Sequence, residues 1–327
     1  MTQPTWIDTL HPNPIPWLLE PENPCVRYLT LTQLLDRPAQ DQDVSAAQQA
    51  MLTYDPVQRI LDAQWPQGYW LHPGVGYSPK YKATVWQIIF LAAMGLPRCE
   101  PLERAVAYVL AHSRLSDGRF SAGQDEQGAV LCLNGNLLRA LIALGYADDP
   151  AVLETRQAMT AQIAGEGLRC RYNSPAGNRP VRMVDGLPCA WGGIKALGAL
   201  VALPPNRRTA AEAQAVQQIR HFLLAHNLAS GDYPTATATS PLWRKPGFPL
   251  GYSADVLEAL TVLLLAGASA DHPAIQATLS LLAAKRDAHG RWPLAHTPGN
   301  GWASFGPLHE PNKWVTWRAL LVFKLST

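Results

Sequence analysis

The segment Gln64-Trp65-Pro66-Gln67-Gly68-Tyr69-Trp70 joins an amphipathic stretch to an apolar one, and similar turns recur along the chain. In each turn a glycine is followed within two residues by a large apolar or aromatic side chain. The other copies are Ser116-Asp117-Gly118-Arg119-Phe120, a degenerate Gly165-Glu166-Gly167-Leu168, Ser230-Gly231-Asp232-Tyr233 and Ala288-His289-Gly290-Arg291-Trp292. They lie about 45–65 residues apart, a spacing typical of stacked helical hairpins. The pattern therefore predicts a chain built from one repeated unit.

The junctions between successive units also repeat. A glycine ends one apolar stretch and a proline opens the next amphipathic one, which is the usual asymmetry of helix ends. The three matching pairs are Gly95 with Pro101, Gly145 with Pro150 and Gly267 with Pro273. They indicate where one hairpin stops and the next begins.

The hydrophobic spacing predicts an all-α chain, because no stretch alternates with period two over a convincing length. Apolar helices are expected at 25–36, 80–95, 132–145, 188–203, 251–267 and 312–325. Amphipathic helices are expected at 43–64, 101–114, 150–164, 209–227 and 273–286.

The ends of the chain favour a closed ring over an open solenoid. An open solenoid usually carries polar capping repeats, whereas the stretch 312–325 is as apolar as the middle helices. We expect one domain over residues 1–327: an α/α toroid, an incomplete α6/α6 barrel with six inner and about five outer helices. The Pro- and Trp-rich segment 1–20 would pack on the ring where a sixth outer helix is missing.

Composition excludes several classes of protein. Hydrophobic residues are 47% and charged residues 16% of 327, which argues against disorder. A net charge of +2 gives no case for a nucleic-acid partner. The apolar runs are far shorter than the roughly 20 residues of a membrane span, and no secretory signal is visible. Five cysteines without regular spacing favour a reducing cytoplasm, with peripheral membrane contact still open.

The Gly-aromatic turns resemble the prenyltransferase and squalene-oxidase repeat, in which a Gln precedes Gly-x-Trp after a short gap. Gln64 with Gly68-Tyr69-Trp70 fits this pattern well, and Gly290-Arg291-Trp292 fits without the Gln. The resemblance extends from about residue 16 to 325. Within the family, the chain is most similar to small stand-alone prokaryotic members. It implies a toroid with a central apolar cavity that accepts an isoprenoid or similar lipid.

The catalytic motifs of that superfamily are not present. The chain has neither the Asp-x-Asp-Asp of protonating cyclases nor the Asp-Asp-x-x-Asp of ionising ones. Asp148-Asp149 precedes Pro150 in a loop, and the residue three beyond Asp149 is Val152. Neither established cyclase mechanism can be transferred by motif.

In a ring of this type the inner helices all begin at one mouth, where their N-termini attract anions. The residues expected there are aromatic or polar. Aromatics beside cations predict a pocket for a diphosphate head and an apolar tail, although polar first turns are also usual for any helix. The candidate substrate-binding residues are Arg27, Tyr28, Lys80, Tyr81, Lys82, Trp86, Asn134, Trp191, Tyr252, His309, Lys313, Trp314 and Trp317.

Asp255 is the best candidate for a catalytic acid. It opens an apolar helix, where a buried carboxyl would have a raised pKa and could donate a proton. An ion pair with a neighbour such as Lys313 is the structural alternative. Asp185 is a second candidate, which could equally be exposed in a loop.

Cys132, Cys170 and Cys189 are expected at the same end of adjacent repeats and could bind zinc. Protein prenyltransferases bind zinc with an Asp-x-Cys motif and a later His. In this chain Asp185 and Cys189 are four residues apart instead of two, and His309 is two repeats away. Buried cysteines are also common apolar side chains. The cofactor therefore stays open, with Zn or Mg possible.

Three functions follow from this sequence. The first is a terpenoid-cyclase-like enzyme that acts on an isoprenoid or similar lipid in the central cavity. The second is a zinc-dependent prenyltransferase-like enzyme, and the third is a non-catalytic toroid that binds a lipid or a protein. The long loops 66–79, 168–188, 232–250 and 291–311 are expected to cover the cavity.

Overall fold

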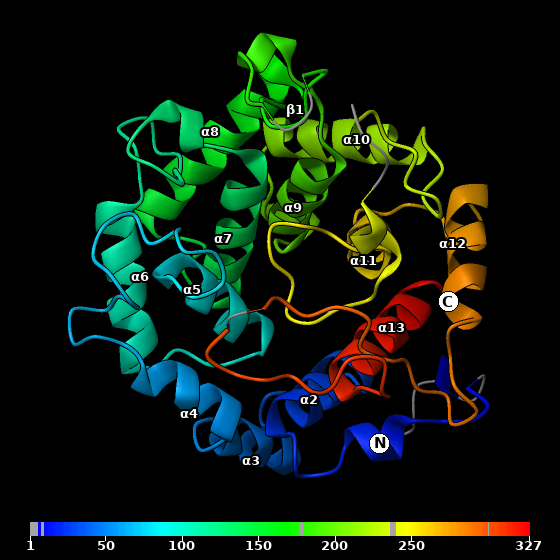
Figure 1. Cartoon of the computed structure of the whole chain (residues 1–327). Helices are drawn as coiled ribbons and strands as arrows, with labels where there is room; N and C mark the ends of the chain where they lie inside the picture. The colour runs from blue at the N-terminus through cyan, green and yellow to red at the C-terminus, as the bar shows by residue number, and fades with distance from the viewer. Residues whose placement is uncertain (1–5, 8–9, 177–178, 236–239, 300) are drawn as a thin grey trace.

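A computed structural model describes residues 6–7, 10–176, 179–235, 240–299 and 301–327. Its helices lie in two layers around a centre (Figure 1). The helices nearest the centre are α2 (Pro24–Leu29), α5 (Thr84–Ala93), α7 (Leu131–Ala143), α9 (Ala190–Val201), α11 (Val256–Leu265) and α13 (Lys313–Leu325). From α5 to α13 each packs on the next, and α13 packs on α2 and on the π-helical turn η2 (Thr30–Leu34) that continues it. Leu29 of α2 approaches Gly95, directly after α5.

The inner helices follow the expected apolar stretches, except that α5 and α11 begin at Thr84 and Val256 rather than at 80 and 251. Every residue from Thr84 to Leu91 and from Val256 to Leu264 is buried, because these helices have neighbours on all sides. Helices buried all round need apolar side chains on every face. This explains why their sequences are continuously apolar rather than amphipathic.

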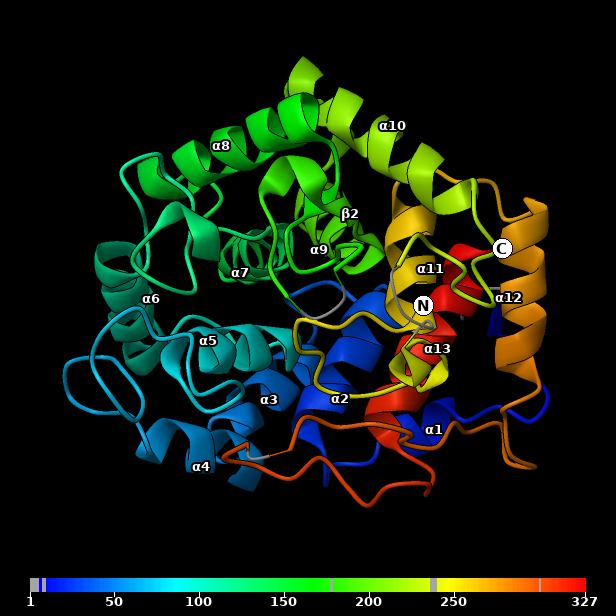
Figure 2. The ribbon, with the colours of Figure 1, turned by 45° about the horizontal axis from the view of Figure 1, so that its top comes forward.

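The outer layer consists of α3 (Gln42–Met51), α4 (Asp55–Asp62), α6 (Glu100–His112), α8 (Pro150–Glu166), α10 (Ala210–Leu224) and α12 (Pro273–Ala283) (Figure 2). The single helix expected at 43–64 is wrong: the chain is interrupted between Met51 and Asp55. Pro56 explains the break, since proline has no N–H and is tolerated only in a first helical turn. The short α1 (Ile15–Leu18) contacts α13.

The structure is mostly helical, as the periodicity predicts, but it contains a small ladder that the sequence analysis missed. Strand β1 (Arg169–Cys170) pairs antiparallel with β2 (Leu187–Pro188). Short 3₁₀ turns lie in the loops: η3 (Glu126–Gly128), η4 (Met183–Asp185), η5 (Pro205–Arg207) and η6 (Pro241–Arg244). Two-residue strands give no periodicity signal, so only the pairing partner reveals them.

The aromatic side chains of the repeated turns are buried and tie the turn to the end of the preceding outer helix. The indole N–H of Trp70 donates to the Ile60 carbonyl at 2.6 Å, and that of Trp292 donates to the Leu282 carbonyl at 2.8 Å. Both bonds go to carbonyls in the last turn of α4 or α12, where the regular pattern of helix hydrogen bonds ends; the Leu282 carbonyl also accepts from the Lys285 N–H.

The same turns are also tied to the inner helix that follows. The backbone N–H of Trp70 donates to Thr84 Oγ1 of α5, and that of Trp292 donates to Thr316 Oγ1 of α13. In the second repeat, the Phe120 N–H donates to Asn134 Oδ1 of α7 at 2.8 Å. One turn thus fixes both the outer and the inner helix of its hairpin.

The glycine of each turn lies against the next element of the outer layer. A Cβ on Gly68 would lie 2.5 Å from the Arg104 carbonyl oxygen of α6, and one on Gly290 would lie 2.5 Å from the Pro12 carbonyl oxygen. Arg291 also lies over the Trp17 ring. The N-terminal segment therefore occupies, for the last repeat, the place that α6 takes for the first. The part of segment 1–20 at residues 1–5 and 8–9 lies outside the described residues.

Within the described ranges, no helix combines the length and apolarity needed to cross a bilayer.

Replacing Gly68 by alanine should lower the free energy of unfolding by about 1–3 kcal/mol, since the new Cβ would meet α6 and the residue has φ +93°. Gly74 is the matched control: its φ is +117°, but nothing lies within 4 Å of its Cβ position. Urea unfolding of both variants measures the difference. Equal losses for the two alanines would contradict the close approach of this turn to α6.

Candidate functional site

A pocket of about 670 Å³ lies where α7 and α9 begin. Its walls come from these helix starts, from the segment 122–130 before α7, and from described residues of three of the four long loops, 66–79, 168–188 and 232–250. The lining includes six aromatic side chains, Tyr77, Tyr172, Trp191, Tyr233, Trp243 and Tyr252. We call it the mouth pocket.

The described parts of the fourth loop, 291–299 and 301–311, lie between the end of α12 and the start of α13. The Trp302 indole N–H donates to the Lys82 carbonyl at 3.0 Å and joins this loop to the segment before α5. The expectation that long loops gather over the mouth agrees with these contacts.

Tyr252 is the centre of the aromatic wall. Its ring is parallel to that of Tyr81, with centroids 6.4 Å apart, and the Trp191 ring meets it edge-on at 5.8 Å. The Lys80 ammonium lies 4.0 Å from the Tyr252 centroid. A cation held over a ring leaves its outer side available to an anion. Lys80 is the only basic side chain in the described lining.

Gly251 allows this cluster to form. A Cβ there would lie 2.4 Å from Cε1 of Tyr81, so only glycine lets the Tyr81 ring pass. The Asn136 side chain of α7 donates to the Gly251 carbonyl at 3.0 Å and fixes the segment from the opposite side.

Three thiols form another part of the wall. Cys132 lies in the first turn of α7, Cys170 in β1 and Cys189 at the N-cap of α9. Burial raises the pKa of Cys132 to about 12, so it stays protonated. No group of three or more His, Cys, Asp or Glu side chains in the described part of the chain is arranged to hold a metal. The zinc hypothesis thus gains no support from these cysteines.

A charged cluster that the sequence analysis missed lies among the inner helices. Glu258 of α11 accepts from Lys195 of α9 at 2.6 Å and from Arg139 of α7 at 3.2 Å. The Lys195 side chain is 1% exposed, whereas that of Arg139 is 41% exposed. Burial is the main influence on Lys195 and lowers its pKa. The sequence did contain a signal for this cluster: α7, α9 and α11 each carry a charged residue among apolar ones. Because an unpaired buried charge is very costly, such residues are expected to pair with one another.

Asp255 is part of the same region, and the expectation that its pKa is raised is wrong. Arg318 donates to both carboxylate oxygens at 2.7 Å, and the N–H groups of Gly247 and Glu258 donate as well. Burial alone would raise the pKa of Asp255, but Arg318 and these N–H groups hold it below the ordinary value. The side chain is an ionised N-cap of α11 with no proton to give. Its partner is Arg318, not Lys313.

Asp185, the second candidate acid, is exposed in η4. It does not line the mouth pocket. The structural alternative in the sequence analysis, a loop-exposed carboxylate, therefore describes it.

Of the candidate substrate-binding residues, the geometry brings Lys80, Trp191 and Tyr252 together in the mouth pocket, with Tyr81 behind them. Trp86 is buried and donates to the Tyr77 carbonyl at 2.7 Å, so it positions the wall from behind. Lys82 lies over the Trp302 ring.

The other candidates lie elsewhere. Arg27 pairs with Asp43, and Lys313 pairs with Glu20. Asn134 holds the Phe120 turn, and Trp314 stacks on Phe248 at 4.1 Å. Tyr28 packs against the core, Trp317 is buried on α13, and His309 is exposed in a loop. None of these lines the mouth pocket.

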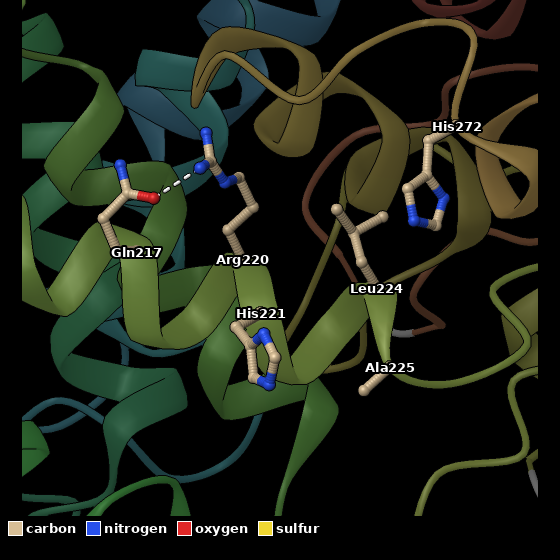
Figure 3. A pocket seen from close by; sticks show the side chains of 6 residues that line it. All are labelled: Gln217, Arg220, His221, Leu224, Ala225 and His272. Carbon is tan, nitrogen blue, oxygen red and sulfur yellow. Dashed lines mark hydrogen bonds between the residues drawn. The ribbon is translucent and has the colours of Figure 1, made fainter.

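A second hollow, of about 510 Å³, lies on the outer layer between α10 and the start of α12 (Figure 3). Its polar groups serve the helices themselves. Arg220 donates to the Ala266 and Gly267 carbonyls that end α11, and His272 caps α12 through Nδ1. The mouth pocket is therefore the better candidate site.

Comparison with known proteins adds little. No protein-family model matches the chain, and no curated protein matches it. Among solved structures, a glycosidase variant has a TM-score of 0.40 at 13% identity, over 88% of this chain and 98% of that one. The wild-type glycosidase has a TM-score of 0.38 at 12% identity over the same shares. Similarity at this level carries no argument about the reaction.

Asp255→Asn should lower the free energy of unfolding by about 3–5 kcal/mol, because it leaves Arg318 buried without a counter-charge. Asp255→Asn combined with Arg318→Met should cost less than Asp255→Asn alone. Urea unfolding measures all three, with Asp185→Asn as the exposed control. A double variant less stable than Asp255→Asn alone would contradict the assignment of a buried ion pair.

The Asp255–Arg318 ion pair should also make the free energy of unfolding depend on pH. Since the pKa of folded Asp255 lies below that of the unfolded carboxyl, its stabilisation is present at neutral pH. It should be lost as the pH falls below about 4, through the unfolded and then the folded pKa. Thermal unfolding between neutral and acidic pH should therefore show a steeper loss for the wild type than for Asp255→Asn. Parallel curves would argue against this titration.

Proposed function

We propose that the chain is a single-domain α/α toroid whose mouth pocket binds a small organic anion with an apolar body, such as an isoprenoid diphosphate or a similar lipid. The observation that carries the proposal is the composition of the pocket wall. It combines six aromatic side chains with one lysine, and none of its described lining residues is a carboxylate.

Size and polarity support this class of ligand. A pocket of about 670 Å³ is within the range of about 300–1,000 Å³ that holds small ligands. Lys80 and the starts of α7 and α9 supply positive potential on one side. The tyrosine and tryptophan faces supply contact area for an unsaturated chain.

The same wall argues for binding rather than for acid catalysis. Asp255 is ionised and neutralised by Arg318, so it does not serve as the acid of a protonating cyclase. Glycoside hydrolysis needs a pair of carboxyl groups facing the substrate, and the described lining supplies none. Of the three functions expected from the sequence, lipid binding is the one that requires neither a catalytic acid nor a metal site in the described lining.

The test is calorimetric titration with farnesyl diphosphate and with farnesol. Lys80→Ala should weaken diphosphate binding by about tenfold, or ~1.4 kcal/mol, and leave farnesol binding unchanged. Trp191→Ala should weaken both. Lys285→Ala, an exposed lysine outside the pocket, is the matched control.

Equal weakening by Lys80→Ala and Lys285→Ala would overturn the assignment of the mouth pocket. Gas chromatography–mass spectrometry of the titrated samples separates binding from turnover. Unchanged farnesyl diphosphate agrees with the proposal, and a new hydrocarbon absent from boiled controls would show that the pocket cyclises its ligand instead of only binding it.

A further inference from the structure

Cys170 and Cys189 come from segments that the β1–β2 ladder holds together. Cys170 pairs with Leu187 across the ladder, and the Cys189 N–H donates to the Leu168 carbonyl at 2.8 Å. Residues two apart along a strand point to the same face. The two cysteines are therefore diagonal neighbours on one face, and both line the mouth pocket.

The two sulfur atoms are in hydrogen-bond contact, and their surroundings differ. The Cys189 thiol donates to Cys170, and the N–H groups of Tyr172 and Asn173 and the Arg171 guanidinium also favour its ionised form; the Asn173 N–H donates to the Cys170 carbonyl at 2.9 Å. These contacts lower the pKa of Cys170 to about 6 even though burial opposes ionisation. Donation to Cys170 and burial raise the pKa of Cys189. The surroundings therefore favour a thiolate on Cys170 beside a neutral thiol on Cys189.

This combination has a recognised chemistry. A thiolate is the nucleophilic form of cysteine, and a thiol held beside it can capture the oxidised product as a disulfide. A thiolate that served only to bind or to alkylate would not need this second thiol. Neither cysteine has a disulfide partner, and Cys132 on the same wall stays protonated.

We propose that Cys170 and Cys189 form a dithiol redox site in the mouth pocket, which reduces an organic hydroperoxide bound there. The Cys170 sulfur attacks the terminal peroxide oxygen, and the O–O bond breaks. The alkoxide leaves as an alcohol after taking a proton from water, and Cys170 becomes a sulfenic acid. The Cys189 sulfur then attacks that of Cys170, so a disulfide forms and hydroxide leaves with the Cys189 proton as water.

The electrons balance: the dithiol gives two and becomes a disulfide, and the hydroperoxide becomes an alcohol and water. An external thiol restores the pair by disulfide exchange. The dithiol chemistry itself does not depend on the proposed function. Only the preference for an organic hydroperoxide rests on it, because the aromatic wall that would hold a lipid would hold the peroxide's apolar body.

The experiment exposes the reduced protein to cumene hydroperoxide or to hydrogen peroxide, with thiol titration and peptide mass spectrometry. The wild type should lose two thiols and contain a Cys170–Cys189 disulfide that dithiothreitol reverses. Cys189→Ser should instead accumulate a Cys170 sulfenic acid that dimedone traps. Cys170→Ser should slow the thiol loss by about tenfold or more.

Cys132→Ser is the matched control, since this thiol lines the same pocket but is not in the pair. It should behave as the wild type. Near-ultraviolet circular dichroism identifies any variant that has not folded. If a variant does not fold, the proposal is judged from the wild type alone, by whether peroxide forms the Cys170–Cys189 disulfide and dithiothreitol reduces it. The rate of Cys170 alkylation by iodoacetamide should rise with pH with a midpoint of about 6, and not near 8.5, the ordinary pKa of a cysteine thiol.

The proposal is overturned if Cys170→Ser is oxidised as fast as the wild type. It is also overturned if the wild-type peroxide product contains no Cys170–Cys189 disulfide. If both peroxides form the disulfide equally fast, the redox site stands and the organic-ligand proposal for the pocket fails. Faster reaction with cumene hydroperoxide, lost in Trp191→Ala, supports both.

Discussion

The repeated turn with a buried aromatic ring is the constraint on which the rest of this structure depends. Trp70 and Trp292 each use the indole N–H to hold the end of an outer helix and the backbone N–H to hold a threonine of the next inner helix. Because these bonds are made inside the protein, breaking them leaves buried polar groups unpaired. These bonds set α4 against α5 and α12 against α13.

That arrangement explains why a pocket forms at the mouth. The loops after the turns must cross from the outer to the inner layer, and those at 66–79, 168–188 and 232–250 contribute Tyr77, Cys170 and Trp243 to one wall. Below the mouth, Arg318 with Asp255 and Lys195 with Glu258 join α9, α11 and α13. The apolar inner helices tolerate these charges only as pairs.

Much of the fold could be predicted from the sequence, because periodicity and Gly-aromatic turns are local signals. The helix break before Asp55 and the β1–β2 ladder could not, since the first depends on three residues and the second on partners 17 and 19 residues away. The site was harder. Lys80, Trp191 and Tyr252 were found from their places at helix starts, whereas the protonation of Asp255 depends on Arg318, a partner 63 residues along the chain. The pairing of Cys170 with Cys189 likewise appears only when the loop between them closes.

We propose that ligands bind in the mouth pocket and not at the hollow on the outer layer. Hydrogen–deuterium exchange with and without farnesyl diphosphate tests it most directly, because the amides report position along the chain. We expect farnesyl diphosphate to slow amide exchange at the starts of α7 and α9 and in the segments that contain Tyr172 and Tyr252. Protection confined to α10 and the start of α12, around the hollow at Arg220 and His272, would contradict it.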